Sequence, residues 1–251
     1  MPSPKHVAEP QAAEDFLRLA LEASNARDRA KFARAGLASE STLGIDADTH
    51  ALLLRQLYLS HLEQRRFRHA AEVARQMAEV GSMPDIAHHD ASRALSALGD
   101  LPAAIVEQRL AARLSPLTRR SFHFWCLGTL QHFAGDVNGA VDSLRRGMRW
   151  ARRDKPLLRA HSAFVRLDSG EGVPKLGEIV KQLAKAPCRE GYGQFLLGML
   201  AHHMGDKGRA TMHLRAFLRR NASLDPAKAT TLREELRRAR TALAQNTTHL
   251  D

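Results

Sequence analysis

The chain has 251 residues, 44% hydrophobic and 26% charged, and 38 basic against 27 acidic residues give a formal net charge of +11. No stretch approaches the roughly 20 apolar residues of a membrane-spanning helix, and the N-terminus lacks the apolar run of a secretory signal. Two cysteines, Cys126 and Cys188, are too few for a disulfide framework. The composition argues against membrane-spanning and disulfide-stapled classes, favours a cytoplasmic protein, and makes anionic partners worth testing.

The N-terminal part of the chain predicts one helical hairpin. Apolar residues have helical spacing over 12–26 and again over 28–38, so we expect a degenerate hairpin over 12–38. The polar stretch from Ser39 to Asp48 is expected to be a loop. Residues 1–11 are expected to form an unstructured tail.

A glycine followed by an acidic residue then recurs at a nearly fixed interval. The pairs are Gly99-Asp100, Gly135-Asp136, Gly170-Glu171 and Gly205-Asp206, in steps of 36, 35 and 35 residues. Glycine at a helix end adopts the left-handed conformation without steric cost, and the carboxylate after it can cap the next helix. A period in the mid-thirties is typical of stacked helical hairpins, so each pair predicts the turn of one hairpin.

A small residue keeps the same distance from each turn. The residues at this position are Ala70, Ala104, Ala140 and Ala210. Helices joined by a short turn approach closely only over a small side chain, so this alanine is expected at the contact between the two arms. Lys175 takes the position after Gly170 and predicts looser packing there. Pro116 and Pro187 are expected to end second arms.

These residues resemble the tetratricopeptide repeat family. Its pattern is W-x2-L-G-x2-Y, then A-x3-F, then P. One copy here is Phe124, Leu127, Gly128, Gly135, Ala140 and Leu144, and another is Leu197, Gly198, Gly205, Ala210 and Leu214. The resemblance implies an all-α, right-handed superhelical solenoid of stacked helix-turn-helix hairpins, forming a single domain over 12–245 with five repeats at about 50–221.

The C-terminal segment predicts a cap for this solenoid. Asp225 is suited to the N-cap and Pro226 to the first helical position, and an amphipathic pattern continues to Gln245. A capping helix over 226–245 would cover the last apolar face. Its outward face is expected to carry Arg233, Glu234, Arg237 and Arg238. Residues 246–251 are expected to form a tail.

The first arms of stacked hairpins are expected to line a concave groove, which gives a candidate partner-binding site. Its residues are Arg55, Arg93, Phe122, Trp125, Thr129, His132, His161, Phe164, Tyr192, Phe195, Met199 and His202. Aromatic side chains concentrate binding energy at protein interfaces. An aromatic stripe at helical spacing is also typical of a core, so about half of the set is expected to be accessible.

A basic patch is the second candidate site. It consists of Arg145, Arg146, Arg149, Arg152, Arg153 and Arg159, and Trp150 lies within it. One interpretation is a solvated outer face of second arms, where arginine stems cover apolar surface. The other is a phosphate-binding track for RNA, DNA or lipid headgroups. A further basic region runs over 207–240, and no base-reading motif accompanies either.

Catalysis is not expected. Thirteen histidines include His88-His89 and His202-His203, but adjacent histidines diverge on a helix and no H-E-x-x-H or C-x-x-C motif accompanies them. Cys126 has no recognisable general base, and neither a nucleophile elbow nor a glycine-rich phosphate loop is present. The sequence thus predicts no enzyme, metal or cofactor.

Two functional hypotheses follow. The first is a non-catalytic scaffold or adaptor for protein–protein interaction, which binds a partner peptide or helix in the aromatic-lined groove. The alternative is a basic anion-binding module for nucleic acid or an acidic membrane surface. Some members of the resembled family clamp a terminal carboxylate, but the comparable positions here are Arg55, Leu59, Asp90, Phe122 and Cys126, so no such clamp is expected.

Overall fold

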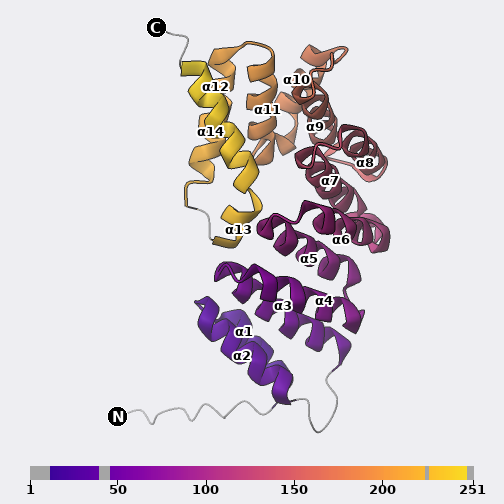
Figure 1. Cartoon of the computed structure of the whole chain (residues 1–251), viewed down its shortest axis with the longest axis vertical. Helices are drawn as coiled ribbons and strands as arrows, with labels where there is room; N and C mark the ends of the chain where they lie inside the picture. The colour runs from indigo at the N-terminus through magenta and orange to yellow at the C-terminus, as the bar shows by residue number, and fades with distance from the viewer. Residues whose placement is uncertain (1–11, 40–45, 224–225, 248–251) are drawn as a thin grey trace.

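A computed structural model describes residues 12–39, 46–223 and 226–247. Within these ranges the regular structure is helical, and consecutive helices pack against each other along the long axis of the molecule (Figure 1). Six pairs of helices follow one another from the N-terminal end of the stack to the C-terminal end. The expected tail at 1–11, residues 40–45 of the expected loop, the Asp225 cap and residues 248–251 lie outside the described residues. The loop was predicted to reach Asp48, but α3 already begins at Ala47, with Asp46 as its N-cap.

The six hairpins agree with the predicted periodicity. They are α1 Ala13–Glu22 with α2 Ala26–Ala38, α3 Ala47–Glu63 with α4 Phe67–Val80, α5 Pro84–Leu98 with α6 Leu101–Leu114, α7 Leu117–Phe133 with α8 Val137–Trp150, α9 Lys155–Asp168 with α10 Leu176–Lys185, and α11 Tyr192–His203 with α12 Lys207–Arg220. A short 3-10 turn, η2 Pro187–Arg189, joins α10 to α11. Two more helices, α13 Pro226–Thr231 and α14 Arg233–Thr247, follow.

The predicted turns have the expected chemistry. The four glycines of the Gly-acid pairs have φ between 75° and 88°, the left-handed region that closes a helix end. The side chains of Asp100, Asp136 and Asp206 each accept a hydrogen bond from the backbone N–H three residues further on. Each of these aspartates therefore caps the second arm of its hairpin, as the sequence predicted.

The fifth hairpin, α9–α10, departs from this pattern at its second arm. Lys175 is exposed, has φ 57° and lies just before α10. Glu171 does not cap this helix, which begins at Leu176 and has 10 residues, against 14 in α8. Lys175 therefore lies outside the contact that the alanines make in the other hairpins.

The alanine contacts are confirmed, and glycine extends them. Ala70, Ala104, Ala140 and Ala210 have no exposed surface. A Cβ atom built on Gly128 would lie 2.8 Å from Cγ of the buried Leu144 and 3.1 Å from the Ala140 carbonyl oxygen. A Cβ atom built on Gly198 would lie 2.6 Å from Cγ of Leu214 and 3.1 Å from its backbone nitrogen. The two arms thus touch through backbone, which fixes the distance between α7 and α8 and between α11 and α12.

The C-terminal segment differs from the single capping helix predicted over 226–245. It forms two helices, and α14 extends to Thr247, so Asn246 lies in a helix and its side chain is buried. In Figure 1 the yellow α13–α14 pair folds back beside the stack, and α13 packs against α3 and α5 while α14 packs against α11 and α12. Arg237 faces outward, as predicted, whereas Arg238 turns inward and is mostly buried.

We predict that Gly128→Ala lowers the free energy of unfolding. The added methyl group must displace Leu144 and the backbone of α8, at a cost of about 1–3 kcal/mol, partly offset by about 1 kcal/mol of helix propensity. The matched control is Gly177→Ala in α10, where a Cβ atom would meet nothing within 4 Å. Denaturant unfolding measures both. A Gly128→Ala variant as stable as the Gly177→Ala control would contradict the close contact.

A second prediction concerns the turn between α3 and α4, which has no glycine. Arg65 has φ 58° and lies five residues before Ala70, at the position that glycine takes in the later hairpins. A non-glycine residue pays about 1–2 kcal/mol for this conformation. Arg65→Gly should therefore stabilise the protein by about 0.5–1 kcal/mol after the entropic cost of glycine in the unfolded chain. Lower stability of this variant would refute the assignment of Arg65 as a strained turn residue.

Candidate interaction groove

The first arms α3, α5, α7, α9 and α11 form what we call the inner face, and the α13–α14 pair lies on it. Helix α13 packs against α3 and α5, and α14 packs against α11 and also against the second arm α12. Arg238 of α14 also contacts Asp168 of α9 and the ring of Phe133 of α7. A helical segment of the same chain thus occupies the surface that was predicted to bind a partner.

Glu235 is the most buried polar contact of α14. Its side chain is 3% exposed, and its Oε1 accepts a hydrogen bond of 3.2 Å from the Tyr192 hydroxyl. Its Oε2 has no hydrogen-bond partner. Burial raises the pKa of Glu235 to about 7 and raises the pKa of Tyr192 well above 10. A carboxyl group in this environment is held near the boundary between its neutral and charged forms.

Asp168 anchors α14 through charge. Its Oδ2 accepts hydrogen bonds from Nε2 of His132, at 2.9 Å, and from Nη1 of Arg238, while Nε2 of His203 lies 3.7 Å from Oδ1. These donors, the two histidines first, hold the pKa of Asp168 well below its ordinary value. The Arg238 guanidinium also lies 5.2 Å from the centroid of the Phe133 ring. One arginine of α14 thus bridges α7 and α9.

Polar contacts also hold the α13–α14 segment, one near its C-terminal end and one at the junction of the two helices. Near its C-terminal end, Nδ1 of His202 lies 3.0 Å from Oδ1 of Asn246. At the end of α13, Nη2 of Arg93 donates a 2.8 Å hydrogen bond to Oγ1 of Thr231. Predicted groove residues from the third and sixth hairpins are therefore hydrogen bonded to this segment.

The structure divides the predicted groove residues into two groups. His161, Phe164 and Phe195 have no exposed surface, and His132 and Met199 have almost none. They fill the space between neighbouring first arms, so in this state they form core and cannot contact a partner directly. The partly or fully exposed members are Arg55, Arg93, Phe122, Trp125, Thr129, Tyr192 and His202. Phe122 is the exposed ring of this set.

Trp125 and His161 connect the two groups. The Trp125 indole N–H donates a 2.9 Å hydrogen bond to Nδ1 of His161, and its ring meets that of Tyr192 edge to face at 4.9 Å. Burial lowers the pKa of His161 to about 3, so this histidine is neutral at physiological pH. Burial likewise raises the pKa of the Cys126 thiol to about 12, which leaves it protonated and a poor nucleophile.

Sequence reasoning missed three residues of this arrangement, Asp168, Glu235 and Arg238. A signal was present for Glu235, which lies between Leu232, Leu236 and Ala239 on the apolar stripe of α14. An acidic residue on such a stripe indicates a buried carboxyl group. The roles of Asp168 and Arg238 depend on helices 70 residues apart in the chain, and no local pattern indicates their pairing.

Only three of the six arginines predicted for the basic patch line one hollow in the structure. Arg145, Arg146 and Arg149 line a hollow of about 410 Å³ between α6, α7 and α8, whose other residues are Ala112, Arg113, Arg120, Phe124 and Trp150. Arg152, Arg153 and Arg159 do not line it, and Arg159 is instead hydrogen bonded to Gln182. Arg113 and Arg120 lie 32 and 25 residues before Arg145, which is why the sequence did not group them with it.

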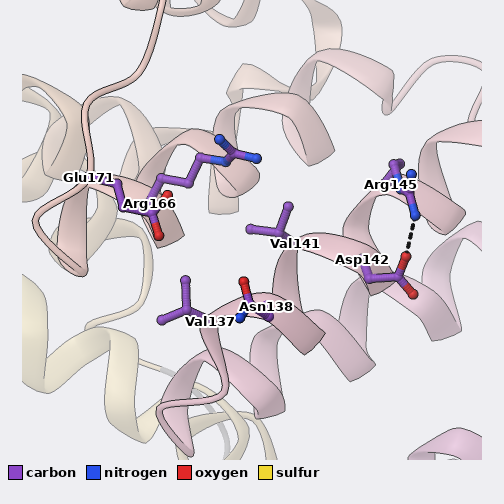
Figure 2. A pocket seen from close by; sticks show the side chains of 7 residues that line it. All are labelled: Val137, Asn138, Val141, Asp142, Arg145, Arg166 and Glu171. Atoms are coloured by element: carbon purple, nitrogen blue, oxygen red, sulfur yellow. Dashed lines mark hydrogen bonds and ion pairs between the residues drawn. The ribbon is translucent and has the colours of Figure 1, made fainter.

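A second hollow, of about 280 Å³, lies between α8, α9 and the start of the α9–α10 connection (Figure 2). The Asp142–Arg145 pair lies on one side and Arg166 and Glu171 on the other, with Val141 between them. Its charges balance, two acids against two bases. No group of three His, Cys, Asp or Glu side chains in the described ranges is arranged to hold a metal ion.

The fold is that of a tetratricopeptide repeat protein. A solved structure of a tetratricopeptide repeat protein from Parabacteroides merdae matches 96% of this chain and 94% of its own, with a TM-score of 0.62 and 11% sequence identity. No family model and no curated protein matches the sequence. In the part of the chain that the structure covers, every helix is too short or too polar to cross a bilayer.

We predict that docking of α14 weakens as the pH rises from about 5 to about 8. The pKa of Glu235 is about 7 in the docked state, against an ordinary 4.5. Between these pH values the docked carboxyl group keeps its proton while the undocked one loses it, so the docked state loses stability as the pH rises. At about 1.4 kcal/mol per pKa unit, the loss is on the order of 2–3 kcal/mol. Glu235→Gln keeps an acceptor for Tyr192 and removes this dependence.

Hydrogen exchange of the α14 amides in both proteins measures this effect. Tyr192 and Cys126 stay neutral in this range because their pKa values are raised, and Asp168 stays charged because its pKa is lowered. The difference between Glu235→Gln and the parent, which cancels other titrations, should therefore grow with pH. Parallel profiles for the two proteins would show that Glu235 does not titrate in the docked helix.

Proposed function

We propose that this chain is a non-catalytic interaction module whose inner face binds a helical segment of a partner protein in the place of α13–α14. The fold supports this proposal because stacked helical hairpins offer a continuous concave surface to a ligand. The observation that carries it is that α14 is bound there by apolar, charged and polar contacts to several first arms. The inner face therefore has the chemistry to hold a helix.

The contacts of α14 define the partner's chemistry. One side of α14 buries Leu236, Ala239 and Ala242. A partner helix in the same place therefore needs small or aliphatic residues at intervals of three. To pair with Asp168, the partner helix needs a cationic side chain. To accept from the Tyr192 hydroxyl, it needs a hydrogen-bond acceptor one turn before that cation. The partner is thus an amphipathic helix with a basic residue on the edge of its apolar face.

Unsatisfied polar atoms make α14 replaceable. Oε2 of Glu235 and Nδ2 of Asn246 are buried on α14 without hydrogen-bond partners, and Nδ1 of His132 is in the same condition beneath it. Each such atom costs about 1–3 kcal/mol relative to a satisfied one. A partner helix that satisfied or omitted these groups would bind more tightly per contact, which offsets the advantage that α14 gains from covalent attachment.

The experiment is an exchange assay on the full chain. A protease site inserted after Ala222, between α12 and α13, is cut after folding, and a labelled peptide of residues 226–251 is added. We expect the labelled peptide to replace the cut segment in a saturable manner. Fluorescence anisotropy of the label measures this exchange. Circular dichroism of the cut protein checks that α1–α12 remain folded.

Two peptide variants form a matched pair. Arg238→Ala removes the side chain that is 19% exposed and bonded to Asp168, and should weaken binding at least tenfold, on the order of 1.5–3 kcal/mol for a charged hydrogen bond. Arg237→Ala removes one that is 62% exposed and bonded only to Glu234 of the same helix, and should change binding less than about twofold. Equal affinities for the two variants, or a cut segment that never exchanges, would rule out the inner face as a helix-binding site.

A further inference from the structure

Three large apolar side chains are exposed at the ends of three consecutive helices. They are Leu114 at the end of α6, Leu117 at the start of α7 and Trp150 at the end of α8, with exposures of 46%, 59% and 41%. The hollow of about 410 Å³ is lined by Arg113, Arg120 and Trp150, so these three helix ends meet at one place on the surface. Leu114 follows Arg113 directly, and Leu117 lies one helical turn before Arg120.

The hollow beside them carries an excess of positive charge. Five arginines line it, and no acidic residue does. Asp142 pairs with two of them, Arg145 and Arg146, at 2.6 and 2.7 Å. Within the described part of the chain, Arg113 and Arg149 make no ion pair. The hollow of Figure 2, by contrast, is charge-balanced, so the excess is particular to this place.

Arg120 shows how the hollow is organised. Its Nη2 donates a 2.8 Å hydrogen bond to the Ser115 carbonyl oxygen, and its guanidinium lies 5.0 Å from the centroid of the Trp150 ring. This contact holds the indole at the rim, next to the α6–α7 connection. The exposed apolar side chains therefore lie beside a hollow whose charged lining residues are all arginines.

We propose that this end of α6, α7 and α8 is a docking surface for an anionic lipid bilayer. Leu114, Leu117 and Trp150 enter the interfacial layer, where leucine gains from burial and the indole prefers to lie. The guanidinium groups of the hollow bind lipid phosphates, to which arginine donates two hydrogen bonds at once. The protein lies on the membrane at this point and does not span it.

The residue types favour a bilayer over nucleic acid. Proteins that hold single strands use aromatic platforms on which successive bases stack. Here Trp150 is the exposed ring at this end of the hairpins, and Arg120 already lies over it. Exposed leucines flanking the proline of the α6–α7 connection add nothing to base stacking but gain directly from contact with acyl chains. The site is also independent of the inner face, because no residue of α13 or α14 lines it.

Vesicle co-sedimentation of the full chain tests the proposal. The probes are vesicles of phosphatidylcholine alone and of phosphatidylcholine mixed with phosphatidylserine, and we expect binding to the second and little to the first. Leu114→Ser with Leu117→Ser should reduce binding at least tenfold, and so should Arg113→Glu with Arg149→Glu.

The controls match these changes elsewhere on the surface. Leu21→Ser removes an exposed leucine of α1, and Arg215→Glu with Arg219→Glu makes the same change of net charge on α12. Both should bind within about twofold of the parent, since long-range attraction alone is screened beyond about 10 Å at moderate salt. Equal losses in the controls and the site variants would mean that only the overall charge attracts vesicles, and would overturn the site.

Tryptophan emission gives a second measurement that folding defects do not mimic. In a Trp125→Phe background the remaining tryptophan is Trp150, and its emission should shift to shorter wavelength when anionic vesicles are added. The absence of a shift would overturn insertion of this end. Titration with a single-stranded oligonucleotide completes the test, because binding to the oligonucleotide but not to vesicles, lost in the same arginine variants, would assign the hollow to nucleic acid instead.

Discussion

The closest contact between the two arms of a hairpin is the constraint on which the rest of this structure depends. At Gly128 and Gly198 the arms touch through backbone, and alanine keeps the spacing at the base of four hairpins. Because each hairpin has the same close side, the next one stacks with its first arm in the same direction. The inner face follows from this repeated contact, and so does the exposure of the helix ends that carry Leu114, Leu117 and Trp150.

The inner face does not remain empty in this chain. Phe164 and Phe195 are buried as core between neighbouring first arms, and Tyr192 is hydrogen bonded to Glu235 of α14. The fit of α14 combines a well-made ion pair, Arg238 with Asp168, with the poorly satisfied carboxyl group of Glu235. The unsatisfied carboxyl oxygen of Glu235 is the reason why we propose that another helix can replace α14 on this face.

Charge is distributed differently on the two surfaces. On the inner face the arginines have carboxylate partners, since Asp90 pairs with both Arg55 and Arg93 and Asp168 pairs with Arg238. The hollow between α6, α7 and α8 leaves most of its arginines without a carboxylate. The net charge of +11 therefore has a local component in the five arginines of this hollow, which is why we propose different partners for the two surfaces.

The sequence by itself determined the helical hairpins, because their signals act over a few residues. A glycine that closes one helix and an aspartate that caps the next give the turn at Gly135-Asp136 without reference to the rest of the fold, and the alanine at 140 follows from the same register. Only the tertiary structure decided which groove residues became core, that α13–α14 folds back onto the first arms, and that Arg113 and Arg120 join Arg145. These outcomes depend on contacts between helices far apart in the chain, where the free energy comes from the fit of whole surfaces and leaves no periodic trace in the sequence.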